Sequence, residues 1–129
     1  MLLNVHSYYS LRYGTLSLEQ IVEDIKRCGY DTAVLTDINN SSAVLDFIRL
    51  TKEKGLHGIG GMEFRNGNEL LYIGIAKDQQ GFKELNELLT KANRENIPLP
   101  QLAPAFDHAF IVYPYGKNKP SELKENEWI

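Results

Sequence analysis

Three residues with chemically useful side chains each stand at the end of a short apolar segment. They are His6, Asp37 and Glu63. If the three segments are parallel strands, their carboxyl ends meet at one edge of a sheet and bring an imidazole and two carboxylates together. Imidazole nitrogens and carboxylate oxygens bind zinc and other divalent metals. The pattern therefore indicates a candidate metal or acid–base site.

The segment around His6 has the spacing of a metal-binding strand in which one ligand is replaced. Residues two apart on a strand point to the same side, so Asn4 and His6 form a His-x-His pair with asparagine in the first place. Simpler roles stay open on spacing alone. His6 can donate a hydrogen bond to a loop carbonyl, and Asp37 can cap the helix that follows it. Glu63 can pair with Arg65.

Other residues that could do chemistry favour structural roles. His57 and His108 stand before apolar segments rather than after them, so both belong to the opposite edge of the sheet. Ser7 and Ser10 lack the surrounding motif of an activated nucleophile. Residues 58–61 (GIGG) lack the Lys-Ser/Thr pair of a phosphate-binding loop and do not lead into a helix.

Strand and helix patterns alternate along the chain. Ser17 and Gln20 form a capping-box pair before an apolar stripe that reaches Cys28, which predicts a helix, and the turn at 65–68 contains Asn-Gly, which predicts a hairpin. A second predicted helix turns Val44, Phe47, Ile48 and Thr51 inward and ends at Gly55. The remaining predicted elements are strands at 2–6, 32–36, 56–64, 69–76 and 109–113, a helix at 80–93, and the start of a helix at Pro120.

This order of elements predicts an α/β fold. Strand–helix–strand units of about 30 residues imply right-handed parallel crossovers, which suit an open doubly wound sheet or part of a (β/α) barrel. The tail ends soon after a charged helix start, and a complete barrel needs roughly 200 residues. We therefore expect residues 1–129 to form a single domain that is a fragment of a longer chain.

Composition narrows the class of protein. The 129 residues are 43% hydrophobic and 24% charged, with a net charge of −3, as in an ordinary globular protein. Cys28 is the one cysteine, so neither a disulfide framework nor a cysteine-based zinc site is expected, and the cytoplasm is the expected compartment. An acidic chain does not favour a direct grip on nucleic-acid phosphates. We expect neither a signal peptide nor a membrane span.

Four stretches, in order and spacing, resemble the PHP (polymerase and histidinol phosphatase) domain. They are VHSYYSLRYGTLS, AVLTDINN, GIGGMEF and GFKELNELLTKAN. The likeness is greatest to the branch at the N-terminus of bacterial DNA polymerase III alpha subunits and covers nearly the whole chain. It implies part of a distorted (β/α)7 barrel with parallel strands, truncated before the barrel is complete. In members with an intact site, clustered metals at the carboxyl ends of the strands hydrolyse phosphoesters.

Carried over residue by residue, the resemblance implies a site that is only partly kept. His6 and Glu63 match metal ligands of the family, and Asp37 matches an aspartate that would support a ligand rather than bind the metal. Three ligand positions are degenerate in this chain. These are Asn4 in place of the first histidine of the pair, Tyr13 in place of an aspartate, and Ile38 in place of a histidine.

A cluster of metals needs most of its ligands, so the resemblance implies no tightly bound cofactor. Residual weak binding of zinc, manganese or magnesium stays open, and we expect the segment itself not to be catalytic. Its implied role is a scaffold in a DNA-directed DNA polymerase, a nucleotidyltransferase of DNA replication. The implied partners are the other domains of the alpha subunit and the proofreading exonuclease, with DNA contacted only through the full polymerase. The alternative is a stand-alone metal-dependent phosphoesterase. Self-association of the fragment is also expected, because an incomplete barrel exposes apolar faces.

Overall fold

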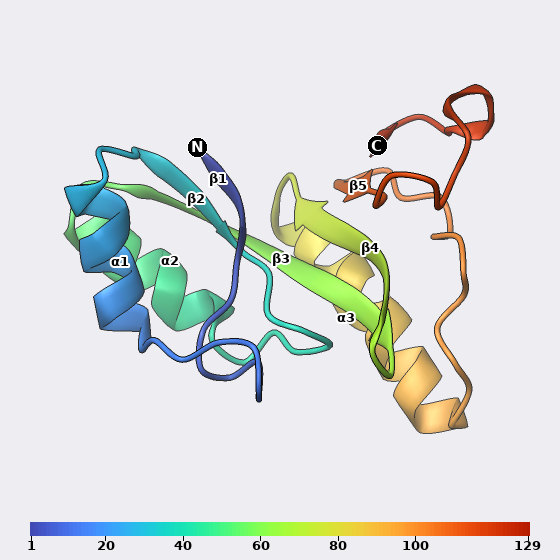
Figure 1. Ribbon diagram of the computed structural model, residues 1–129, viewed down its shortest axis with the longest axis horizontal. Helices are drawn as coiled ribbons and strands as arrows, with labels where there is room; N and C mark the ends of the chain where they lie inside the picture. The colour runs from blue at the N-terminus through green and yellow to red at the C-terminus, as the bar shows by residue number, and fades with distance from the viewer. The chain divides into compact units, whose positions relative to one another are not determined.

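The computed structural model describes all residues from 1 to 129 and divides into two compact units, residues 1–62 and 63–129. Figure 1 shows the elements in chain order. These are β1 (Leu2–Val5), α1 (Leu18–Arg27), β2 (Thr32–Leu35), α2 (Val44–Glu53), β3 (His57–Asn66), β4 (Glu69–Ala76), α3 (Gln79–Glu95), β5 (Ala109–Val112), the 3-10 helix η1 (Pro120–Glu122) and β6 (Glu127–Trp128). Hydrogen-bonded neighbours give the strand order β1-β2-β3-β4-β5-β6.

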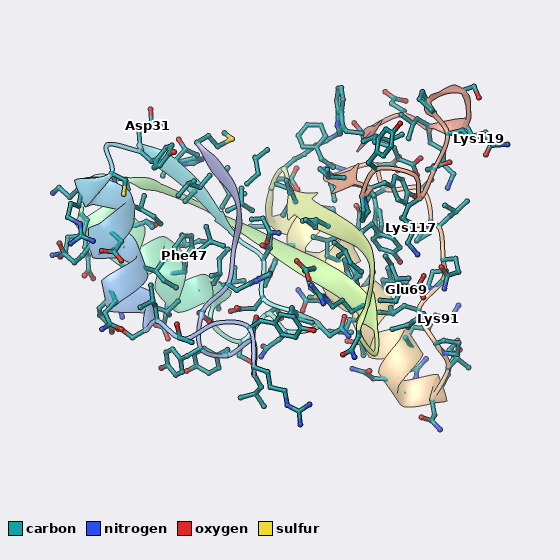
Figure 2. All side chains as sticks on the ribbon, in the orientation of Figure 1. Asp31, Phe47, Glu69, Lys91, Lys117 and Lys119 are labelled. Atoms are coloured by element: carbon teal, nitrogen blue, oxygen red, sulfur yellow. The ribbon has the colours of Figure 1, made fainter.

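The first unit contains the predicted parallel crossovers. β1 pairs with β2, and β2 pairs with the start of β3 in a continuous parallel register from Thr32 opposite His57 to Leu35 opposite Gly60. The two connecting helices, α1 and α2, lie side by side (Figure 1). The core of this unit is apolar, with β2 almost wholly buried and Phe47 of α2 fully enclosed (Figure 2).

Local sequence explains the bounds of α1. The Ser17 side chain accepts a hydrogen bond from the Gln20 N–H, and the Gln20 side chain accepts one from the Ser17 N–H, which confirms the capping box. At the other end, Gly29 adopts φ +77°, a left-handed conformation that glycine takes with little strain. The buried face comprises Leu18, Ile21, Val22 and Ile25, at the spacing of an amphipathic helix.

The second unit is built on antiparallel and parallel pairs. β4, the returning strand of the predicted hairpin, runs antiparallel to β5, and β5 runs parallel to β6. Helix α3 packs against β4 and β5. The packing is close because a Cβ at Gly74 of β4 would overlap the side chain of Leu85, and one at Gly81 of α3 would overlap the carbonyl oxygen of His108. Glycine at both positions therefore allows the helix to approach the strands.

The α/β class and the hairpin are confirmed, but three local predictions are wrong. Ile48 and Cys28 are exposed rather than inward, because each lies at the margin of an apolar stripe that its neighbours already fill. The tail continues from Pro120 as a single 3-10 turn and then as the strand β6 instead of a helix. Its backbone carbonyls accept hydrogen bonds from Ile111 and Tyr113, a non-local pairing that overrides the local helix signal. None of the helices has the length and hydrophobicity needed to cross a membrane.

Candidate functional site

The loop that carries His6 away from β1 is folded back on itself. His6 is half-buried and directly follows the strand. The Tyr8 N–H donates to the carbonyl of Leu16 (3.0 Å), and the Gly14 N–H donates to that of Ser10 (2.9 Å). A Cβ at Gly14 would overlap the carbonyl oxygen of Ser7, so only glycine fits where the loop closes. These contacts hold the loop in one conformation, and this conformation determines the positions of Ser7 and Ser10.

Asp37, just after β2, accepts hydrogen bonds from this loop. Its carboxylate is 1% exposed. Oδ1 accepts hydrogen bonds from the Ser7 N–H (2.7 Å) and the Ser10 hydroxyl (2.6 Å), and Oδ2 accepts one from the Ser7 hydroxyl (2.6 Å). The Ser10 Oγ also accepts from the Ile38 N–H (3.0 Å). Three neutral donors from the loop thus surround the carboxylate, and we name Ser7, Ser10 and Asp37 the serine–aspartate cluster.

This cluster decides between the roles left open for Asp37. Helix α2 has Ala43 at its N-cap and no side-chain capping bond, so the capping role is wrong. Asp37 instead ties the end of β2 to the loop after β1, and a side chain held by three donors has few lone pairs left for a metal ion. The structural roles of Ser7 and Ser10 were not found from the sequence. The sequence shows only that two serines follow the first predicted strand, and such a pattern is too common to identify the residue to which they bind.

Asn4 also takes part in a contact between the first two strands. The Thr36 hydroxyl donates to the Asn4 Oδ1 (2.6 Å) and accepts from the Val5 N–H (3.2 Å). The amide oxygen at the degenerate ligand position therefore joins β1 to the end of β2. Of the other two degenerate positions, Tyr13 is exposed and Ile38 is half-buried next to the cluster.

Glu63 lies in the second unit, where it is paired with Arg65. Both residues are on β3, two apart, and so on the same face of the strand. The Arg65 Nε donates to the Glu63 Oε1, and the two side chains are 14% and 1% exposed. The pairing left open by the sequence is thus present. Asn66 holds the end of the strand, because its amide donates to the Leu99 carbonyl (2.9 Å) and accepts from the Leu99 N–H (3.0 Å).

These donors do not fit a cluster of metal ions. In neither unit do three or more His, Cys, Asp or Glu side chains gather into a group that could hold one. Asp37 is occupied by serine donors and Glu63 by a guanidinium. The structure brings the loop after β1 to Asp37, because Ser7, the residue after His6, donates two hydrogen bonds to that carboxylate. The role of His6 and Glu63 as metal ligands stays a prediction.

His57 and His108 lie outside this region, at the start of β3 and just before β5. The His108 Nδ1 is 2.8 Å from Asp78 Oδ2, and Asp78 also caps α3 by accepting from the Gly81 N–H. The hydrogen bond to Asp78 raises the pKa of His108 above its usual value, and the pKa of Asp78 is lowered, first by the Gly81 N–H and then by His108. This histidine therefore fastens the loop before β5 to the start of α3.

Two relatives found by sequence comparison carry the same name, DNA polymerase III subunit alpha. Over 133 aligned residues the chain is 26% identical to the DNA polymerase III subunit alpha of Staphylococcus epidermidis, an alignment that covers 98% of this chain and 12% of that protein. It is 30% identical over 109 residues to the DNA polymerase III subunit alpha of Treponema pallidum, covering 74% of this chain and 9% of the other. The chain therefore spans only about a tenth of the length of these curated relatives.

The fold has relatives among hydrolases. A protein described as a metal-dependent phosphoesterase from Bifidobacterium adolescentis superposes with a TM-score of 0.56 at 15% identity, over 71% of this chain and 32% of that one. At this identity the likeness concerns the fold alone, and the smaller share of the neighbour agrees with part of a larger barrel. The model of the PHP domain family matches residues 3–119. A match over nearly the whole chain shows that the protein belongs to the PHP domain family.

Proposed function

We propose that residues 1–129 are the N-terminal PHP segment of a bacterial replicative DNA polymerase III alpha subunit, with an architectural role. The alignment with such a subunit over 98% of the chain carries this proposal. The nucleotidyl transfer of DNA replication would belong to later parts of the polymerase chain. The segment would support those parts, and its partners would be the other domains of the alpha subunit and the proofreading exonuclease. The compartment would be the cytoplasm.

The contacts at the candidate site support an architectural role over a catalytic one. A hydrolytic metal centre needs ligands with free lone pairs and an open coordination position for water. Here Asp37 accepts three hydrogen bonds from Ser7 and Ser10, and Arg65 is bound to Glu63. The first interaction holds two segments of the fold together, and the second lies within β3. We propose that His6 and Glu63 retain at most weak affinity for zinc, manganese or magnesium.

A stand-alone phosphoesterase is the second candidate, and one observation favours it. The fold resembles that of a protein described as a metal-dependent phosphoesterase. The family resemblance of the sequence argues against this candidate, because asparagine, tyrosine and isoleucine occupy positions 4, 13 and 38, where ligands are predicted to be missing. The two candidates differ in what they require of His6, which is a metal ligand in one and dispensable for any activity in the other.

The test measures bound metal and hydrolysis together. The purified chain and its His6→Ala variant are analysed for metal content and assayed with bis-p-nitrophenyl phosphate in the presence of Mn²⁺ or Zn²⁺. We expect substoichiometric metal and equal background rates for both proteins. His57→Ala is the matched control, since His57 lies at the opposite end of a strand. Stoichiometric metal with turnover that His6→Ala abolishes and His57→Ala keeps would establish the phosphoesterase instead.

A second measurement addresses the polymerase context. The open reading frame that encodes this segment is sequenced in both directions, and we expect it to continue into a polymerase region. The encoded polymerase is then made without residues 1–129 and supplied with the segment as a separate chain. Recovery of primer extension by the added segment is the expected result. A reading frame with no polymerase region would contradict the proposal.

A further inference from the structure

The strand β3 carries an acid and a base whose burial is unusual for charged residues. Glu63 is 1% exposed and Arg65 is 14% exposed, whereas salt bridges such as those of Arg49 with Asp46 and Glu53 have both partners more than half exposed. Charged side chains are almost never fully buried unless they are paired. The environment of Glu63 thus requires a positive charge close to its carboxylate.

The geometry of β3 determines which residue supplies this positive charge. Positions 63 and 65 share a face of β3, so the guanidinium reaches the carboxylate along the strand without any change in the backbone. Arg65 Nη1 also lies 3.4 Å from the carbonyl oxygen of Asn68 in the hairpin turn. The turn and the Asn66–Leu99 hydrogen bonds keep this part of the chain in place. Arg65 is therefore positioned by the hairpin itself.

We propose that Arg65 is a built-in cation that takes the place of a divalent metal ion at Glu63. Arginine is a fixed cation in proteins, and here it donates to Glu63 Oε1 without needing a coordination shell or an entry path. A metal ion approaching the same oxygens meets the repulsion of a fixed positive charge. Glu63 consequently binds divalent ions at most weakly as long as Arg65 is present. This inference rests on the contacts of β3 and is independent of the proposed role in a polymerase.

The test removes the charge and asks whether a metal ion can replace it. Arg65→Met keeps most of the side-chain volume and removes the guanidinium, and Glu63→Gln removes the negative charge. Unfolding in urea is followed for the wild-type chain, both single variants and the double variant, each in EDTA and in Mn²⁺. Arg49→Met is the control, because Arg49 is 58% exposed and its pairs with Asp46 and Glu53 lie at the surface.

In EDTA we expect Arg65→Met to lower the folding equilibrium constant by about a hundredfold, since the loss of one partner leaves a buried charge. Arg49→Met should change it by no more than about fivefold. Adding Glu63→Gln to Arg65→Met should recover at least about tenfold, because the uncompensated charge is gone. Mn²⁺ should stabilise Arg65→Met more than the wild type and should not stabilise the double variant in this way.

Three results would overturn the inference. Arg65→Met and Arg49→Met could destabilise equally, the effects of the two β3 substitutions could be additive, or Mn²⁺ could act equally on wild type and Arg65→Met. If Arg65→Met does not fold, the double variant decides: its folding supports the inference, and its failure to fold contradicts it. None of these readouts depends on polymerase or hydrolase activity, so this inference and the proposed function can fail separately.

Discussion

Two buried carboxylates of this protein are stabilised in different ways. Asp37 and Glu63 are each 1% exposed. Asp37 follows the buried strand β2, and Glu63 lies within the buried run of β3. Asp37 is surrounded by neutral donors, the Ser7 N–H and two hydroxyls. Glu63 is neutralised by the guanidinium of Arg65. The first arrangement depends on a loop, and the second lies within one strand.

The two carboxylates differ in how far along the sequence their hydrogen-bond donors lie. The donors to Asp37 come from residues about 30 positions away in sequence, so the carboxylate and the loop order each other. The donor to Glu63 is two residues away, so that pair forms as soon as the strand does. Loss of Asp37 should therefore disorder a segment beyond itself, whereas loss of the pair at Glu63 should act locally on β3.

The largest effect is expected for Asp37→Ala. The substitution leaves three donors without their acceptor, two of them hydroxyls of buried serines, which we expect to lower the free energy of unfolding by about 3–4 kcal/mol. Urea denaturation measures the change, and Asp46→Ala at an exposed position of α2 is the control. Ser10→Ala should cost less, roughly 1–3 kcal/mol. Equal effects of Asp37→Ala and Asp46→Ala would show that the serine–aspartate cluster is not structural.

An intermediate effect is expected from two buried tyrosines of the second unit. The Tyr113 hydroxyl accepts from the Ala103 N–H (3.0 Å) and donates to Glu127 Oε1 (3.1 Å), and burial raises its pKa to about 12. The Tyr72 hydroxyl is buried without a hydrogen-bond partner, and burial raises the pKa of Tyr72 as well. The two phenols extend the comparison from charged groups to neutral ones.

Tyr113→Phe should lower the free energy of unfolding by roughly 1–3 kcal/mol, because it leaves the buried Ala103 N–H without its acceptor and removes the hydroxyl that donates to Glu127 Oε1. Tyr72→Phe should leave stability unchanged or raise it by up to about 1 kcal/mol, since it removes an unsatisfied hydroxyl. Thermal and urea denaturation of the two variants side by side give the answer. A greater loss for Tyr72→Phe than for Tyr113→Phe would contradict the contrast.

The smallest effect is expected at the exposed pair of His108 and Asp78, where the cation can titrate. The pKa of His108 is raised above 6.5 by its bond to Asp78, so its contribution to stability is complete below pH 6.5 and is lost as pH rises through the raised value. The pKa of Asp78 is lowered below 3.8, so its contribution is present above pH 3.8 and is lost as pH falls through the lowered value.

His108→Gln should therefore destabilise the protein most between these limits, at mildly acidic pH, and the difference from wild type should shrink as the solution becomes alkaline. Melting temperatures across this pH range measure the effect. His57→Gln, at an exposed histidine in the first unit, is the matched control. A difference that is the same at acidic and alkaline pH would show that charge on His108 does not contribute.

Much of the fold follows from local sequence. The capping box at Ser17 and Gln20, the glycine after α1 and the Asn-Gly turn act over a few residues, and each lies where the sequence places it. The crossovers of the first unit follow from the alternation of apolar segments. The tail differs, because β6 depends on carbonyls that pair with β5, about 15 residues away. Periodicity within a segment carries no information about such a partner.

The sequence by itself determined which chemical groups stand near the ends of the first three strands, and its resemblance to the PHP family predicts missing ligands at positions 4, 13 and 38. Only the tertiary structure decided which donors the two carboxylates among them contact, and whether any of these groups binds a metal stays a prediction. Asp37 was open to several roles until the loop after β1 brought Ser7 and Ser10 to it, and Glu63 until β3 placed Arg65 beside it. The physical reason is that a buried carboxylate must be compensated, and the fold selects which nearby donor supplies the compensation.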